Sequence, residues 1–227
     1  MINERIMPMP QRARELLVRK YWGGDDIHFL AHDKANEHCL IRPHLGRRRI
    51  GRQLSRTRPR RLRIFSLRNF PLHMDQIEEL GLPAKDYAIA MADALAFLHW
   101  IAKVDANDVE FVLARCRSSP ASRLPGIGSC EFASEAFGRH AMWLLDFDCC
   151  KMPTMNEAGI CHAARCFWRN DPFYPRPGSR VLQDEQLWQA FKHRFLYTSN
   201  SILQEEEYSV RRLPGLLMER ITERCSN

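Results

Sequence analysis

The chain has 227 residues, of which 45% are hydrophobic and 27% charged, a balance that excludes wholesale disorder and predicts one globular domain, or one and a half. The formal net charge is +7. No apolar run approaches the length of a membrane-spanning helix, and no secretory signal is expected at the start. The eight cysteines are therefore expected to be reduced, in the cytoplasm or the nucleus.

In chain order, hydrophobic periodicity and turn residues predict a helix over 11–21, strands over 39–45 and 62–70, a weak helix over 74–80, a strong helix over 84–102, a strand over 109–114, a short helix over 131–137, a strand over 141–147, and helices over 156–169, 184–199 and 213–223. The helix over 84–102 is expected to be central and buried, because Tyr87, Met91, Leu95 and Ile101 fall on one face. This order predicts an α+β fold with a mainly helical C-terminal half.

Positive charge is concentrated in the segment 42–63, which holds ten arginines and neither lysine nor acid. Without these ten charges the rest of the chain has a net charge of −3. The segment has no helical or alternating period and predicts a solvated loop between two strands. The alternatives are a nuclear-import signal and a phosphate-backbone contact. Nucleic acid is the less favoured partner, because no aromatic residue interleaves with the arginines before Phe65.

Four acidic residues flank the strands predicted over 109–114 and 141–147: Asp105, Glu110, Asp146 and Asp148. A hairpin would bring these strand ends together, so the carboxylates could face one pocket. Clustered carboxylates suit a hard divalent cation such as Mg²⁺, which can bridge nucleotide phosphates. The alternative is that these acids are solvated turn residues and helix caps.

A second group of ligand-type residues lies within eighteen positions: Cys149, Cys150, Cys161, His162 and Cys166. His162 and Cys166 are four residues apart on one helix face, so both could reach one zinc ion. The chain contains no Cys-x-x-Cys pair, and free cysteine is commonly a small buried hydrophobe. Both interpretations stay open from the sequence.

The helix ending in Leu98-His99, the loop Asp105-x4-Glu110 and the sequence Asp146-Phe147-Asp148 after a hairpin resemble the C-terminal lobe of protein kinases and their aminoglycoside-phosphotransferase-like relatives. By this resemblance Asp105 would be the catalytic base, Glu110 and Asp146 would bind Mg²⁺, and Asp148 would be a weaker ligand. The resemblance implies that residues 1–72 are the remnant of an N-terminal lobe and hinge, with an arginine-rich loop over 42–63, and that residues 73–227 form a helical kinase-like lobe.

The chain is also similar to a family of uncharacterised fungal proteins that are often labelled as zinc finger proteins. The stretches that carry this similarity are Glu4-Arg5-Ile6, Cys39-Leu40-Ile41-Arg42, Leu67-Arg68-Asn69-Phe70-Pro71-Leu72, Asp105 to Leu113, Trp143 to Asp148, and Asn170-Asp171-Pro172-Phe173-Tyr174-Pro175-Arg176-Pro177. The last stretch predicts a rigid corner that packs Phe173 and Tyr174 onto the helices, with Asp171 and Arg176 placed to pair.

Several features of an active kinase are missing from the sequence. It has no G-x-G-x-x-G and no Val-Ala-Ile-Lys, Lys103 stands where a kinase has histidine, and Asp148 stands where it has glycine. The sequence therefore predicts a kinase-like fold with a truncated N-terminal lobe, acting as a non-catalytic, pseudokinase-like module that binds a protein or a small molecule. The alternative is an ATP- and Mg²⁺-dependent small-molecule phosphotransferase, or another enzyme, using the Asp105/Asp146 pocket.

Overall fold

The structure is a computed structural model that describes residues 5–22, 27–49, 65–117 and 130–223. Its described elements are α1 (Gln11–Tyr21), α2 (Ile27–His32), α3 (Lys34–Glu37), β1 (Ile41–His44), β2 (Phe70–His73), α4 (Met74–Glu79), α5 (Ala84–Trp100), β3 (Glu110–Ala114), β4 (Glu131–Ser134), β5 (Gly138–Leu145), α6 (Glu157–Arg169), α7 (Leu182–Ile202), α8 (Tyr208–Arg211) and α9 (Leu213–Glu223). This confirms the α+β class. Among the described residues, no helix is long and apolar enough to cross a membrane.

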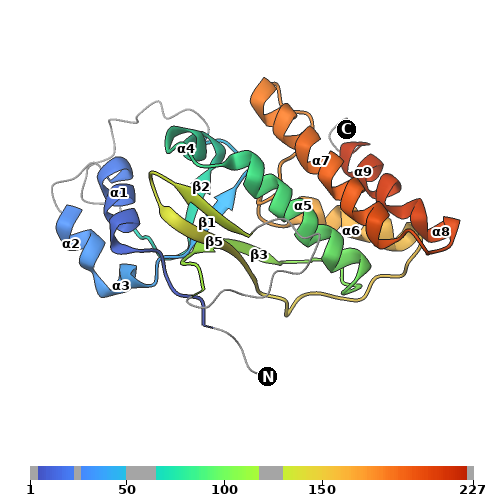
Figure 1. The fold of residues 1–227 in the computed structure, drawn as a ribbon, viewed down its shortest axis with the longest axis horizontal. Helices are drawn as coiled ribbons and strands as arrows, with labels where there is room; N and C mark the ends of the chain where they lie inside the picture. Colours follow the sequence, from blue (N-terminus) through green and yellow to red (C-terminus); the bar gives the residue numbers. More distant parts are fainter. Residues whose placement is uncertain (1–4, 23–26, 50–64, 118–129, 224–227) are drawn as a thin grey trace.

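Five strands form one mixed sheet in the order β2-β1-β3-β5-β4. β1 pairs in parallel with β2, and the other neighbouring strands pair antiparallel. Strand β1 therefore lies inside the sheet, next to β3. The segment expected as a lobe remnant (1–72) and the segment expected as a helical lobe (73–227) thus both contribute strands to one sheet. Their division at residue 72 stays a prediction. Figure 1 shows α1 to α3 at one end of the molecule and α6 to α9 at the other, with α5 crossing the sheet between them.

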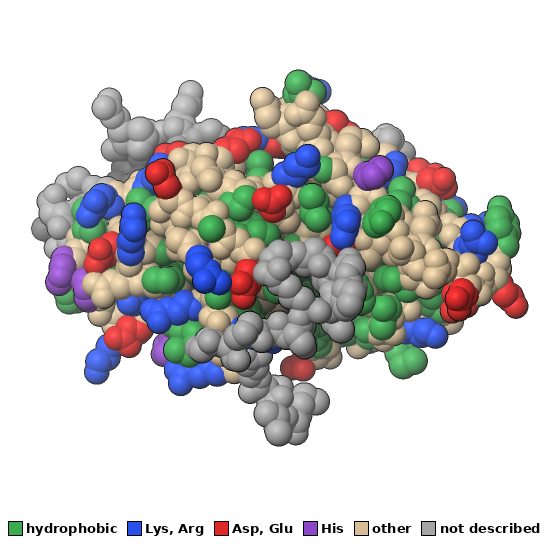
Figure 2. All heavy atoms as spheres, viewed as in Figure 1, with side chains coloured by type: hydrophobic (Ala, Val, Ile, Leu, Met, Phe, Trp, Pro, Cys, Tyr) green, Lys and Arg blue, Asp and Glu red, His purple; other side chains and the backbone are tan. Residues whose placement is uncertain are grey.

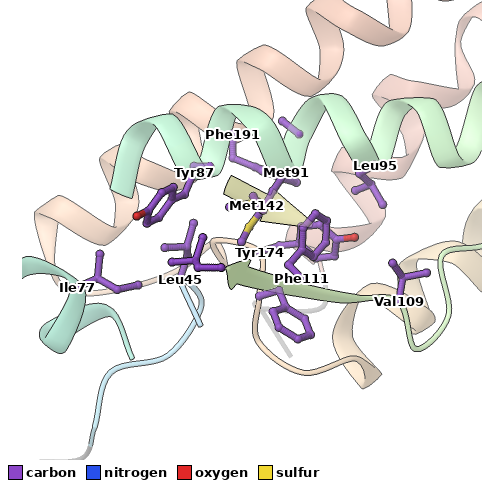
Figure 3. Close-up of a cluster of buried hydrophobic side chains, with 14 of the residues drawn as sticks. Leu45, Ile77, Tyr87, Met91, Leu95, Val109, Phe111, Met142, Tyr174 and Phe191 are labelled. Carbon is purple, nitrogen blue, oxygen red and sulfur yellow. The ribbon is translucent and has the colours of Figure 1, made fainter. Parts of the chain in front are cut away.

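Helix α5 is the central helix that the sequence predicts. Tyr87, Met91 and Leu95 are at most 2% exposed, and Figure 3 shows them on the side of α5 that faces the sheet, where Met142 and Phe111 lie. The opposite side of α5 packs along α7. Ile101, which the sequence places on the buried face, follows the helix as its C-cap and is 55% exposed.

Two elements differ from the sequence prediction. β2 begins at Phe70 and contains Pro71, whereas a strand over 62–70 ending before this proline was expected; residues 62–64 lie outside the described part. Proline is tolerated because β2 is an edge strand, where no neighbour requires its N–H. Residues 131–134 form a strand, not the helix expected over 131–137. A turn ending at Gly138 (φ +64°) returns the chain from β4 to β5 and lets the pair form a ladder.

The part of the arginine-rich segment that the structure describes, residues 42–49, makes internal ion pairs. Arg48 contacts Glu78 at 2.7 Å and Asp184 at 2.6 Å, and Arg49 contacts Asp75 at 2.6 Å. These arginines join β1 to α4 and α7, which favours a structural role for them over a phosphate contact. The remaining arginines from Arg52 to Arg63 lie outside the described residues. Figure 2 shows other Lys and Arg side chains gathered over α1 to α3.

Candidate functional site

The loop over 101–109 joins α5 to β3 and has an unusual backbone. Lys103, Ala106 and Asp108 have φ values of +54°, +52° and +65°, and Asp146, which follows β5, has +66°. Residues other than glycine seldom adopt this left-handed region, and such residues concentrate at functional sites. Four of the five described non-glycine residues with positive φ thus lie at the end of the β3–β5 hairpin where the sequence predicts a site.

Asp105, the candidate catalytic base, is 1% exposed and its carboxylate is fully engaged. Its Oδ1 accepts hydrogen bonds from the backbone N–H groups of Asn107 (3.1 Å) and Lys151 (3.0 Å), and its Oδ2 lies 2.9 Å from Nε2 of His162. Burial alone would raise the pKa of Asp105, but these donors outweigh it and hold the pKa below its usual value. Asp105 therefore fastens the loop to α6 and to the segment that follows β5.

Glu110, a candidate Mg²⁺ ligand, begins β3 and pairs with Arg42 of β1 at 2.6 Å. Burial raises the pKa of Glu110, and the carboxylates of Asp146, Asp171 and Asp108 raise it further, although Arg42 acts in the opposite direction. Several acids therefore lie close enough to Glu110 to destabilise its charged form. Arg42 also lies 3.6 Å from Asp171 and balances part of this negative charge.

Asp146 and Asp148 are both exposed and follow β5 directly. The β3–β5 register pairs Glu110 with Leu145, which places Asp146 one residue beyond Glu110's partner. Both aspartates lie within electrostatic range of Cys149. Desolvation raises the pKa of the Cys149 thiol, and the negative charges of Asp108, Asp146 and Asp148 raise it further. The structure thus places Asp146 near Glu110 and Asp148 near Cys149, while the Asp105 carboxylate is directed at α6.

Sequence reasoning missed two acids and one amide at this site. Asp108 and Asp171 join the acids around Glu110. The buried side chain of Asn170 accepts from the N–H of Asp108 (2.9 Å) and donates to the carbonyl of Ala106 (2.7 Å). Asp108 and Asp171 stand in the stretches that carry the family resemblance, but spacing alone does not show that loop 101–109 meets the end of α6.

The stretch from Asn170 to Pro177 forms the rigid corner that the sequence predicts. Phe173 and Tyr174 are 1% and 2% exposed, and the Tyr174 ring stacks on Phe167 of α6. Asp171 reaches Arg42, and Nη2 of Arg176 donates to the backbone carbonyls of Trp168 and Asn170. The corner therefore serves to hold the end of α6 against the sheet and the loop.

Two of the four cysteines in this group, Cys150 and Cys166, lie near Asp105, whereas Cys149 and Cys161 have other neighbours. Cys166 is 1% exposed, and its Sγ lies 3.5 Å from Nε2 of His162. Cys150 lies near Asp105 and Cys166, which contribute, after burial, to the raised pKa of its thiol, about 11. Cys149 is exposed beside Asp108, and Cys161 lies within electrostatic range of Arg220 in α9. Asp105, His162 and Cys166 are the described His, Cys, Asp and Glu residues that converge closely enough to hold one metal ion.

Comparison with known families gives one match. Residues 142–207 are similar to the family DUF3669, which is described as a zinc finger protein. The matched part is less than a third of the chain and contains Asp146, Asp148, the cysteine group and the corner at Asn170, but neither Asp105 nor Glu110. No curated protein and no solved structure gives a significant match.

Proposed function

We propose that the protein is a non-catalytic binding module with a kinase-like arrangement of its C-terminal part. Supporting this, a buried helix (α5) leads through a loop into β3, β3 pairs with β5, an aspartate follows β5, and helices α6 to α9 come next. Apart from β4, which lies between β3 and β5 in the chain, that order is the one seen in the second lobe of kinases. The proposal separates this arrangement from the chemistry of phosphoryl transfer.

The closed carboxylate of Asp105 is the observation that carries the proposal. A general base must come within hydrogen-bond distance of the proton that it removes. Asp105 is 1% exposed, and both of its oxygens already face donors from Asn107, Lys151 and His162. The charge balance points the same way, because phosphoryl transfer requires cations around the phosphates. Here Arg42 is held by Glu110, and further acids surround that pair.

The acidic surface at the hairpin end favours a positively charged partner. Its exposed members Asp108, Asp146, Asp148 and Asp171 surround the β5 terminus, and Phe147 between two of them is 48% exposed. Complementary charge speeds encounter and selects the partner, while an exposed aromatic ring adds apolar contact. We therefore propose that this surface binds a basic segment of another protein.

A matched pair of variants tests this partner. An arginine-rich peptide is titrated into the full chain, with a glutamate-rich peptide of equal length as the reference. We expect the arginine-rich peptide to bind, more weakly at high salt, and the double variant Asp146→Asn/Asp148→Asn to weaken binding several-fold. The variant Glu205→Gln/Glu206→Gln removes the same charge from exposed residues after α7 and should bind normally. Equal weakening by both variants would contradict a specific surface.

The alternative function is Mg²⁺-dependent phosphoryl transfer to a small molecule. One observation favours it: the acids around Glu110 repel one another, and a divalent cation would relieve that repulsion. Calorimetric titration with ATP, with and without Mg²⁺, separates the two functions. The binding module predicts no measurable ATP affinity in either condition. Mg²⁺-dependent ATP binding that is lost in Asp146→Ala would instead contradict this expectation and favour the phosphotransferase alternative.

A further inference from the structure

Three side chains of different ligand chemistry meet between loop 101–109 and α6. Oδ2 of Asp105, Nε2 of His162 and Sγ of Cys166 all lie within 4.8 Å of one another. His162 and Cys166 are one turn apart on the same face of α6, and Asp105 approaches from the loop before β3. Asp105 and Cys166 are buried, whereas the side chain of His162 is 39% exposed. The cluster is therefore enclosed but reachable from solvent through His162.

The geometry does not fit a catalytic triad. In a nucleophile–base–acid triad the histidine uses its two ring nitrogens for two different partners. Here Asp105 and Cys166 both approach the same nitrogen, Nε2, at 2.9 Å and 3.5 Å. One ring nitrogen has a single lone pair or a single proton, so it can make only one good hydrogen bond to the two of them. Three donor atoms around one point is instead the arrangement that a metal ion requires.

We propose that Asp105, His162 and Cys166 bind a zinc ion, with Cys150 as the fourth ligand. Zinc binds nitrogen at about 2.0–2.1 Å, sulfur at about 2.3 Å and carboxylate oxygen at about 2.0–2.2 Å, so a tetrahedral site separates nitrogen from sulfur by about 3.5 Å and nitrogen from oxygen by about 3.3–3.5 Å. The first separation equals that between His162 and Cys166. The distance between Nε2 of His162 and Oδ2 of Asp105, which is 2.9 Å, would have to lengthen by a few tenths of an ångström when the ion binds.

The donor set selects zinc among the common ions. Mg²⁺ and Ca²⁺ prefer oxygen ligands throughout, and a mixture of one thiolate or two with imidazole and carboxylate suits zinc. The similarity of residues 142–207 to a family described as a zinc finger protein agrees with this ion. The site is nevertheless unlike a finger, because one of its ligands, Asp105, lies well before that segment and the chain has no Cys-x-x-Cys pair.

Cys150 is the cysteine best placed to complete the site. Its half-buried Sγ lies 3.6 Å from the carbonyl of Asn107, and the N–H of the next residue, Lys151, binds Oδ1 of Asp105. The Cys150 thiol also lies within electrostatic range of Asp105 and Cys166, and the proposal requires its side chain to turn from the Asn107 carbonyl towards the ion. Cys149 faces Asp108, and Cys161 lies towards α9, so these two serve as matched controls.

The zinc ion would connect three segments that are distant in sequence: the loop before β3, the segment after β5, and α6. Because the complete site does not exist in an unfolded chain, binding free energy becomes folding free energy. The role is structural and is independent of what the acidic surface at the hairpin end binds. Removal of zinc is therefore expected to lower the melting temperature of the full chain.

The test begins with the full wild-type chain. After purification without added metal, elemental analysis should find one zinc per chain. Replacement by Co²⁺ should give the visible bands of a tetrahedral ion and a near-ultraviolet thiolate charge-transfer band. Zinc content no higher than in a folded control protein, or a Co²⁺ complex without the thiolate band, would overturn the proposal, and neither measurement depends on a variant that folds.

Variants then assign the ligands by competition for zinc with a chromogenic chelator. Asp105→Asn, His162→Gln and Cys166→Ser should each weaken zinc binding by more than the roughly 10- to 100-fold lost when outer-shell partners are removed. Cys166→Ser and Cys150→Ser should each remove about half of the thiolate band, and Cys149→Ser and Cys161→Ser should leave it unchanged. Zinc retained in the folded triple variant of Asp105, His162 and Cys166 would refute the site. An undiminished band in Cys150→Ser would refute the fourth ligand.

Discussion

Asp93 of α5 and Arg194 of α7 form a two-pronged ion pair, with Nε to Oδ1 at 2.7 Å and Nη2 to Oδ2 at 2.9 Å. The hydroxyl of Thr198, one turn further along α7, donates to the same carboxylate. The side chain of Asp93 is 3% exposed. The two longest helices of the described structure are thus joined by a buried carboxylate, in addition to the hydrogen bond from Nε1 of Trp100 in α5 to the hydroxyl of Ser199 in α7.

Removal of this carboxylate should be costly. Asp93→Ala leaves Arg194 without its buried partner, and we expect a loss of about 2–4 kcal/mol in the free energy of unfolding, measured in urea. Glu223→Ala breaks the exposed Arg220–Glu223 pair and should cause no measurable change. A loss no larger than that of the Glu223 variant would show that the Asp93 carboxylate contributes nothing to the packing of α5 on α7.

Two glycines should respond oppositely to replacement by alanine. A Cβ on Gly46 would lie 2.3 Å from the backbone oxygen of Tyr174, and the N–H of Gly46 donates to the carbonyl of Pro172 at 2.9 Å. Backbone atoms cannot move aside as the end of a side chain can. Gly46→Ala should therefore lower the free energy of unfolding by at least about 1–3 kcal/mol. Gly215, inside α9, has open space around it, so Gly215→Ala should stabilise by about 0.5–1 kcal/mol. Thermal melts of both variants provide the comparison.

The amide of Asn170 should be essential to loop 101–109. Asn170→Ala removes the contacts to the N–H of Asp108 and the carbonyl of Ala106 and leaves both groups without that partner. We expect a loss of about 1–3 kcal/mol and faster amide hydrogen exchange throughout the loop. Asn200→Ala, at an exposed position in α7, is the control: it should not destabilise the fold, because alanine favours helix, and it should leave the exchange of the loop unchanged. Unchanged exchange in the Asn170 variant would mean that the other contacts of the loop, such as those of Asp105 and of His99 with the Val104 carbonyl, are sufficient to hold it.

His44 should make the fold sensitive to acid. It is 5% exposed, and burial lowers its pKa to about 4, with Asp171 acting in the opposite direction and His73, Arg47 and Arg42 adding to the decrease. The unfolded chain, where histidine titrates near 6.5, therefore binds the proton first. Stability is retained above about pH 6.5 and falls as the pH decreases towards 4, by about 3 kcal/mol for this group.

The variant His44→Phe isolates this effect. Phenylalanine keeps the ring against Phe173, and among the described residues neither nitrogen of His44 has a hydrogen-bond partner to lose. We expect the variant to be at least as stable as the wild type at pH 7 and to lose less stability between pH 6.5 and 4. His193→Gln, at an exposed position, should leave the slope unchanged. An identical slope in the His44 variant would assign the acid sensitivity to other groups.

Much of the fold could be predicted from the sequence because strong periodicity coincides with burial. The helix around Tyr87 and Met91 and the strand containing Phe111 are both read from their apolar patterns. β4 could not be recognised, because its residues and the following Glu135-Ala136-Phe137 favour a helix locally and only pairing with β5 makes them a strand. The position of Pro71 in a strand likewise depends on the edge, which is a property of the whole sheet.

The site was predicted less completely, since its geometry is set by contacts between distant segments. The sequence identifies Glu110, Asp146 and Asp148 as neighbours of one hairpin end. It does not reveal that Asp105 faces His162, 57 residues later, or that Asp171 joins the acids around Glu110 through the corner after α6. Arg42 could not be foreseen as their counter-ion, because its position depends on β1 entering the sheet beside β3.

The interior position of β1 determines how the chain can be shortened. A fragment that starts at residue 73 would leave the edge of β3 uncovered and Glu110 without Arg42. Exposed strand edges recruit other chains, so such a fragment should aggregate on expression, as measured by light scattering. A monomeric, folded fragment would contradict this expectation. Strands β1 and β2 thus protect the edge of β3 from other chains. A shortened chain should keep Met9, which is buried and whose N–H donates to the carbonyl of Cys39.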